Sequence, residues 1–276
     1  MSVAYVLSGG ASLGAMQVGM ARALIEHDIR PSVIVGASVG AMNGSWLAGH
    51  GNVVDLDING LERLWKGLSR ADVFPLEFVG GLLGFVGKRR SLLSDHGLRR
   101  LLADALTFDR LEDAQIPFAI IATDVLTGDL VVLDEGPAEP AIRASASIPA
   151  VFPPVRHGGR WLMDGGVASN TPLETAVAMG ATRIFVLPAQ TVGPQELPSN
   201  AIGMAVHAVS LLIDARVESE RKNMREGIEV TVLTAESTGG VSPVDFSKTA
   251  ELITAGYSGA SRILDEYIEA NPPLPK

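Results

Sequence analysis

The chain has 276 residues, of which 47% are hydrophobic and 5% aromatic, a composition that suits a globular core built mainly from aliphatic side chains. Its 22 basic and 31 acidic residues give a net charge of −9, which argues against nucleic acid as a partner. Because it contains no cysteine, a disulfide framework and a cysteine-based metal site are excluded, and its five histidines show no metal-ligand spacing.

The predicted elements begin with two strand-turn-helix units. Apolar runs predict strands at residues 3–7 and 32–36, and helical spacing follows at residues 11–29 and 39–50. A repeated strand-helix order predicts a parallel sheet with helices on its faces.

The same patterns continue to the end of the chain. Helices are expected at 55–70, 94–106, about 200–222 and 247–269, and strands at 117–125, 130–134, 183–189 and 228–235. Ser94 or Asp95 is expected to cap the second of these helices. No Pro/Ser linker or charge block divides the chain. We therefore expect one α/β domain over residues 1–276, with three α/β/α layers and a mainly parallel central sheet.

The location of the protein is predicted from what the sequence lacks. Its start, MSVAYVLSGG, has no basic region before the apolar run, so a cytoplasmic protein is expected. No apolar run reaches the roughly 18 residues of a membrane-spanning helix. The segment FVGGLLGFVGKRR, residues 78–90, suggests peripheral contact with an anionic membrane. The alternative is a buried loop beside a solvated charge cluster.

Ser38 is the first candidate catalytic residue. The run from Gly36 to Gly40 reads G-x-S-x-G between a predicted strand and a predicted helix. Two glycines there let the backbone turn sharply, which lifts the serine hydroxyl clear at the carboxyl end of the strand. An ordinary glycine-rich turn is the alternative, since short patterns of small residues are common.

A serine nucleophile needs a base, and no histidine is well placed for that role. An ordinary α/β-hydrolase follows its serine with an acid and then a histidine. Here His157 precedes the strongest acid candidate, and His207 lies inside a helical run. His27, His50 and His96 sit at predicted helix ends, as caps or surface residues.

Asp164 is the better candidate for the base. An apolar segment leads to it, a Gly-Gly turn follows, and then comes a helix capped by Asn170 or Thr171, with Pro172 at its first position. The alternative is an ordinary Asp-Gly turn. A carboxylate of normal pKa is a weak base toward a hydroxyl, so this mechanism requires burial of Asp164.

The glycine loop LSGGASLGAMQ, residues 7–17, is the third candidate feature. Gly9 and Gly10 permit close approach of the backbone, and the amides of residues 9–14 could form a nest for an oxyanion. The rival interpretation is an NAD(P)-dependent oxidoreductase that uses residues 8–14 as a dinucleotide loop. It is weakened because no Tyr-x-x-x-Lys pair is present.

With these pieces in this order, the sequence resembles the patatin-like phospholipase family of Ser-Asp acyl hydrolases. The matching segments are LSGGASLGA, GASVG and DGG, together with ATDVLTG, IRASASIPAVFPPV and DFSKTAELITAGY. The agreement runs from about residue 3 to the last helix. The resemblance implies a patatin-like fold.

The resemblance also implies roles for individual residues. Ser38 would be the nucleophile and Asp164 the base of a dyad. The remaining assignments are Gly9, Gly10 and Ala11 in the oxyanion loop, Gly36 and Gly40 in the nucleophile elbow, and Gly165 and Gly166 in the aspartate motif. The implied reaction is hydrolysis of acyl-ester lipids through an acyl-enzyme, of the lipase, phospholipase A or lysophospholipase type, with no metal and no organic cofactor.

The oxyanion loop departs from the family pattern Gly-Gly-Gly-x-Arg-Gly. Ala11 adds a Cβ, which is tolerable where its φ is negative, and Leu13 replaces the arginine. A non-catalytic lipid-binding protein on the same fold is therefore a further alternative.

Overall fold

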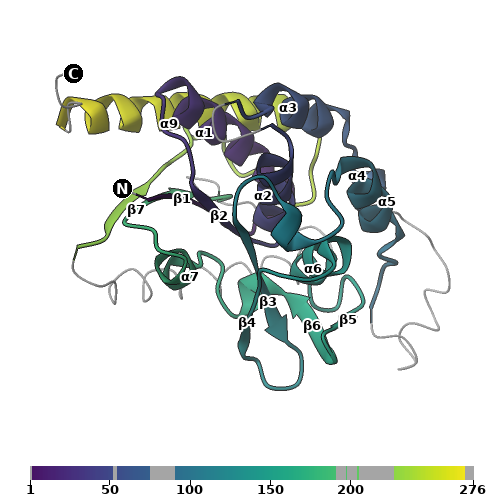
Figure 1. Ribbon diagram of the computed structural model, residues 1–276. Coiled ribbons are helices and arrows are strands. Elements are labelled where there is room, and N and C mark those ends of the chain that lie inside the picture. Colours follow the sequence, from purple (N-terminus) through teal and green to yellow (C-terminus); the bar gives the residue numbers. More distant parts are fainter. Residues whose placement is uncertain are drawn as a thin grey trace.

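The computed structural model describes residues 2–51, 55–74, 91–190, 197, 204 and 227–270, and a central sheet runs through it (Figure 1). Eight strands form this sheet in the described part of the chain. They are β1 (Val3–Leu7), β2 (Val33–Ala37), β3 (Phe118–Asp124), β4 (Leu130–Leu133), β5 (Val155–His157), β6 (Arg160–Asp164), β7 (Arg183–Leu187) and β8 (Glu229–Val232).

The sheet has a parallel part and an antiparallel part. The strand order is β5-β6-β3-β2-β1-β7-β8, with β4 paired to β3. The pairs from β3 through β2, β1 and β7 to β8 are parallel, whereas β4, β5 and β6 join by antiparallel pairing. The expected mainly parallel sheet is confirmed. The short β5 was not predicted because Arg156 and His157 interrupt its apolar pattern.

The register on β3 brings two distant strands together. Ala37 at the end of β2 pairs with Ile121, and Asp164 at the end of β6 pairs with the next residue, Ala122. Both Ile121 and Ala122 also pair with β4, which therefore occupies the opposite edge of β3. It follows that β2 and β6 share one edge of β3 and meet there end to end.

Helices cover both faces of the sheet (Figure 1). The described helices are α1 (Ala15–Glu26), α2 (Val39–Gly49), α3 (Ile58–Gly67), α4 (Arg70–Val73), α5 (His96–Ala105), α6 (Ala138–Ser145), α7 (Leu173–Ala178) and α9 (Thr249–Ala270). Short 3-10 turns lie at Ala11–Gly14, Leu111–Asp113 and Gly165–Val167. The short helices α4 and α6 were not predicted, and the helix expected at about 200–222 lies outside the described residues apart from position 204.

Alternation along the strands divides the core into two clusters. On β1, Tyr5 and Leu7 pack into the larger cluster with α1, α2, α5 and α9, whereas Ala4 and Val6 pack into the smaller cluster with α7. Successive side chains of a strand point to opposite faces, so an almost wholly apolar strand serves both layers. The expected three-layer α/β/α architecture is confirmed.

Candidate active site

Ser38 lies on a sharp turn between β2 and α2. Its backbone has φ 54° and ψ −124°, a positive-φ conformation that is uncommon outside glycine. A Cβ on Gly36 would lie 2.4 Å from the Gly40 carbonyl oxygen, and one on Gly40 would lie 2.1 Å from the Leu7 carbonyl oxygen. Only glycine fits at either position, which gives the G-x-S-x-G pattern a steric cause.

Asp164 meets Ser38 because their strands meet on β3. The Ser38 hydroxyl donates a hydrogen bond of 2.6 Å to Asp164 Oδ2, across 126 residues of chain. Ser38 is 7% exposed and Asp164 is 4% exposed. The structure thus brings together the two residues that the sequence proposed as a dyad, in a site largely closed to water.

Burial sets the proton affinity of Asp164. Loss of hydration raises the pKa of this carboxyl to about 6, against the opposing effect of hydrogen bonds from Ser38 and from the Gly166 N–H. At neutral pH the group is still ionised, yet it is a stronger base than an exposed aspartate. This meets the requirement that the sequence placed on an aspartate base.

The described histidines lie elsewhere. His157 ends β5 at the hairpin where it pairs with Arg160, and partial burial lowers its pKa. His50 stacks on Trp46, and His27 contacts Asp265. None of the described histidines hydrogen-bonds either dyad residue. His207 lies outside the described part of the chain.

The glycine loop lies against the Ser38 turn, with one N–H already engaged. Gly9 donates its N–H to Asn170 Oδ1 at 2.8 Å, so this donor is not available to an oxyanion. Within the described residues, the N–H groups of Gly10 and Ala11 donate no hydrogen bond. Ala11 and Ser38 line the same pocket. Two of the three predicted oxyanion residues therefore retain a usable donor.

Ala11 does not meet the condition of a negative φ under which its Cβ would be tolerated without strain. Its φ is 50°, in the left-handed region that glycine adopts freely and alanine does not. Ala11 is also the first residue of the 3-10 turn Ala11–Gly14. The chain keeps the left-handed backbone and accepts the strain of a Cβ there.

Asn170 has a different role from the predicted helix cap. Helix α7 begins at Leu173 with Pro172 as its N-cap, and the Asn170 side chain instead holds both backbone groups of Gly9. It thereby links the aspartate turn to the glycine loop. Sequence reasoning missed this contact because Asn in a turn is far more often a local cap.

Three further groups hold the dyad, and sequence reasoning gave them no role. Ser145 Oγ accepts the Ser38 N–H at 2.9 Å, and the Ser147 carbonyl accepts the Asp164 N–H at 2.9 Å. Thr123 Oγ1 donates to the Asp164 carbonyl at 2.8 Å. All three lie in the segments ATDVLTG and IRASASIPAVFPPV. The sequence resemblance included these segments but assigned no role to their residues.

A network of buried side-chain hydrogen bonds supports the glycine loop. Gln17 donates to the carbonyls of Ser8 and Leu187, at 2.8 and 2.9 Å. Asn43 donates to Gln17, and Trp65 donates to Asn43. Satisfied buried polar groups of this kind specify one arrangement of the backbone. They fix the glycine loop relative to α2 and α3.

An apolar pocket opens from Ser38. Its walls come mainly from α2, α3, α5 and the segment 146–152. Representative lining residues are Met42, Leu64, Trp65, Leu98, Leu102 and Phe152. The pocket offers a ligand many dispersion contacts, which suits a hydrocarbon chain beside the serine hydroxyl.

Two expectations about membranes and metals concern the wider molecule. The segment 78–90, proposed for membrane contact, lies outside the described residues. In the described part, no helix is long and apolar enough to cross a membrane. No group of three or more His, Asp or Glu side chains in that part could hold a metal ion.

Known proteins resemble this chain in sequence and in fold. It is 29% identical over 188 residues to patatin-like phospholipase domain-containing protein 7 of Rattus norvegicus, and 27% identical over 193 residues to lysophospholipase NTE1 of Mycosarcoma maydis. These matches cover 67% and 68% of this chain but 13% and 10% of the relatives.

A solved structure supports the fold assignment. The crystal structure of VipD from Legionella pneumophila matches with a TM-score of 0.59 at 16% identity, covering 96% of this chain and 67% of that one. The model of the family described as patatin-like phospholipase matches residues 5–177. Because this match covers more than half of the chain, the chain belongs to the patatin-like phospholipase family.

Proposed function

We propose that this protein hydrolyses acyl esters of lipids, with Ser38 as nucleophile and Asp164 as general base. The observation that carries the proposal is the 2.6 Å hydrogen bond from the Ser38 hydroxyl to a buried carboxylate. A nucleophile and base within hydrogen-bond reach are the signature of covalent catalysis. Membership of a phospholipase family supports a lipid ester as substrate.

The geometry gives each group a step in the reaction. Ser38 Oγ attacks the ester carbonyl while its proton passes to Asp164 Oδ2. The N–H groups of Gly10 and Ala11 stabilise the oxyanion that forms. The leaving alcohol takes the proton from Asp164 and departs, which leaves the acyl group on Ser38. Water then attacks this acyl group, with Asp164 again as base. The bond between the acyl carbon and Ser38 Oγ breaks, Oγ takes the proton back from Asp164, and the carboxylic acid leaves.

The pocket favours a hydrocarbon chain on the acyl side of the ester. Its apolar walls begin at Ser38, so an acyl chain can lie among them while its carbonyl carbon faces the hydroxyl. A relative is named a lysophospholipase. We infer phospholipid or lysophospholipid esters as the substrate class. The cytoplasmic location expected from the sequence stays a prediction.

Two site variants and a control variant test the proposal. Wild type should react with a fluorophosphonate probe and hydrolyse a graded series of acyl esters. Ser38→Ala should lose both activities. Asp164→Asn should fold but lose turnover by about 10² to 10⁴, the usual contribution of a general base. Ser258→Ala, on α9, should match wild type in both assays.

The outcomes separate the alternative functions. An inert wild type that still binds lipid would support a non-catalytic lipid-binding protein. Quenching in a nicotinamide fluorescence titration would support the oxidoreductase interpretation. Full turnover in Asp164→Asn would contradict the dyad and would favour His157 or His207 as the general base.

A further inference from the structure

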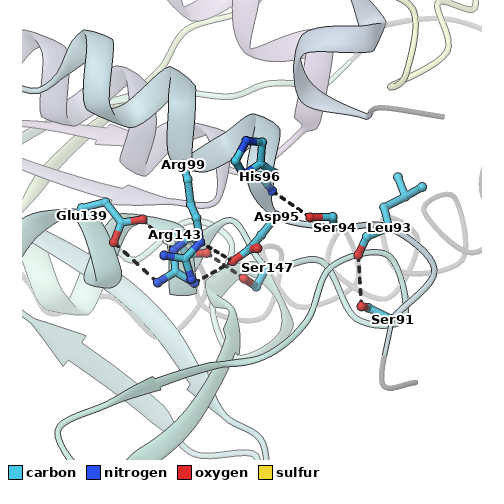
Figure 2. A network of polar contacts seen from close by, with 9 residues as sticks. All are labelled: Ser91, Leu93, Ser94, Asp95, His96, Arg99, Glu139, Arg143 and Ser147. Carbon is cyan, nitrogen blue, oxygen red and sulfur yellow. Dashed lines mark hydrogen bonds and ion pairs between the residues drawn. The ribbon is translucent and has the colours of Figure 1, made fainter. Parts of the chain in front are cut away.

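Arg143 is a buried cation that the proposed chemistry does not use. Its side chain is 8% exposed and lies on α6. Nε donates to Glu139 Oε1 at 2.6 Å, one turn earlier on the same helix, and Nη1 donates to Asp95 Oδ2 at 2.8 Å, before α5 (Figure 2). Apolar residues of similar volume would often be at least as stable as a buried ion pair. The desolvation cost of this buried ion pair suggests that the pair is needed to hold α5 and α6 in one particular geometry.

Asp95 faces α6 rather than capping its own helix. The side chain makes no cap hydrogen bond to α5, and Ser94 Oγ accepts the His96 N–H instead. Asp95 Oδ2 accepts hydrogen bonds from Arg143 Nη1 and, at 3.1 Å, from Nε of the more exposed Arg99 (Figure 2). Among the described residues, the pair with Arg143 is the ion pair that joins α5 to α6.

This ion pair lies at the base of a pocket wall. Leu98, Leu101 and Leu102 of α5 line the apolar pocket. Just before Asp95, the N–H groups of Leu92 and Leu93 donate to the carbonyls of residues 150 and 151, next to a further lining residue at 152. The backbone of residues 92 and 93 thus holds the chain before α5 to the segment 146–152, and the Asp95–Arg143 pair holds the start of α5 to α6. A shift of α5 would change the shape of the pocket.

The dyad is held by different atoms. Ser145 and Ser147 reach Ser38 and Asp164 through hydroxyl and carbonyl groups, and the Arg143 guanidinium contacts neither dyad residue. The reacting atoms sit at the meeting of β2 and β6, whereas the ion pair acts on α5. The Ser147 hydroxyl also donates to the Arg143 carbonyl at 2.7 Å, but this backbone contact does not involve the guanidinium. Substitution of the two charged side chains can thus affect the pocket without displacing the serine.

We propose that the Asp95–Arg143 ion pair is a specificity-determining contact that fixes the α5 wall and thereby sets the preference for long acyl chains. Both residues are positioning residues, because neither touches the ester. This inference rests on the proposed hydrolysis of acyl esters. It names the part of the pocket that selects the chain.

The test compares a butyrate ester with a palmitate ester of the same alcohol. In Asp95→Asn, kcat/KM for palmitate should fall about tenfold through KM, which is the size of a lost apolar contact in a pocket. Butyrate should be hydrolysed as by wild type. The double variant Asp95→Leu/Arg143→Met removes both charges and leaves no buried ion unpaired, so it keeps the fold and should shift the ratio likewise.

Matched variants and a binding assay complete the design. Arg99→Gln removes the contact of the more exposed arginine with Asp95, and it should leave the ratio of the palmitate to the butyrate kcat/KM unchanged. Asp95→Glu keeps the negative charge and should retain most of the wild-type ratio. In a Ser38→Ala background, affinity for a fluorescent long-chain fatty acid should fall with Asp95→Asn. An unchanged ratio in the double variant, or a parallel loss for both esters, would overturn the inference. A wild type that is inert toward both esters would overturn the proposed hydrolysis. Fatty-acid binding that Asp95→Asn leaves unchanged in the Ser38→Ala background would overturn this inference.

Discussion

At the scale of single residues, the site depends on what surrounds one carboxyl group. Asp164 is ionised at neutral pH although it is buried, because Ser38 and Gly166 donate hydrogen bonds to it. Burial makes it basic, and the two donors keep it charged. A serine with an aspartate of this kind can form a nucleophile and base without an imidazole.

The raised pKa of Asp164 predicts a pH dependence. Protonation removes the base, so kcat/KM for a neutral ester should fall as pH drops through about 6. Release of the acid, measured by chromatography, tests this. A flat profile from pH 5 to pH 8 would contradict the role of Asp164 as base.

The same pKa predicts an opposite trend in stability. The folded state holds this proton more tightly than the unfolded state, so protonation favours folding below about pH 6. Relative to Asp164→Asn, wild type should gain on the order of 2 kcal/mol in free energy of unfolding between pH 7 and pH 4, at about 1.4 kcal/mol per pKa unit. Urea denaturation of both proteins across that range measures the difference.

Ala11 predicts a stabilising substitution. Its φ of 50° strains an alanine, and glycine relieves the strain at some cost in unfolded-state entropy. Ala11→Gly should raise the free energy of unfolding by up to about 1 kcal/mol and keep the N–H for the oxyanion, so turnover should not fall. Ala15→Gly, at φ −57°, is the control and should destabilise. A loss of stability in both variants would contradict the strain at Ala11.

At the scale of elements, the site is the place where two strand ends meet. Strands β2 and β6 run in opposite directions and end at adjacent residues of β3. Ser38 directly follows β2 and Asp164 is the last residue of β6, so the two residues lie close together. The turn after β2 fits because Gly36 and Gly40 leave room for neighbouring carbonyls. Strand pairing supplies the distance, and the glycines supply the turn.

This packing predicts a strong effect of one added methyl group. In Gly40→Ala the new Cβ would lie 2.1 Å from the Leu7 carbonyl oxygen, so the protein should lose about 2 kcal/mol or more and most fluorophosphonate labelling. Gly67→Ala, also in a helix but with nothing within 4 Å of the new Cβ, should be neutral or gain about 0.5 kcal/mol. Thermal melts of the two variants give the comparison. Equal stability would show that β1 yields at this point.

At the scale of the whole molecule, one core joins both ends of the described chain. The larger apolar cluster includes residues from Tyr5 to Leu264, with members from the sheet and from most helices. A site made from residues 38 and 164 needs such a continuous frame. The single domain over residues 1–276 stays a prediction, since the curated relatives are much longer than this chain.

A single domain predicts one cooperative unfolding transition. Far-ultraviolet circular dichroism reports the helices, while fluorescence reports Trp46 on α2, Trp65 on α3 and Trp161 on β6. The two signals should give the same midpoint in urea, as two-state unfolding requires. Separate midpoints would show that the layer with α3 and α5 unfolds apart from the sheet.

The sequence by itself determined the local features. Apolar periodicity predicted β1, β2, β3 and β7 with their neighbouring helices, because buried parallel strands and helices have distinct periods. The glycine pattern around Ser38 and the Asp-Gly-Gly turn were also visible, since each reflects a steric need of its own backbone. These features were enough to propose Ser38 and Asp164 as a pair.

Only the tertiary structure decided how those features act together. The end-to-end meeting of β2 and β6, the hold of Asn170 on Gly9 and the clamp of Arg143 on Asp95 join residues 48 to 161 positions apart. No local pattern encodes such contacts, because they depend on strand pairing and burial. For the same reason the pKa of Asp164 follows from the fold, whereas the choice of aspartate follows from the sequence.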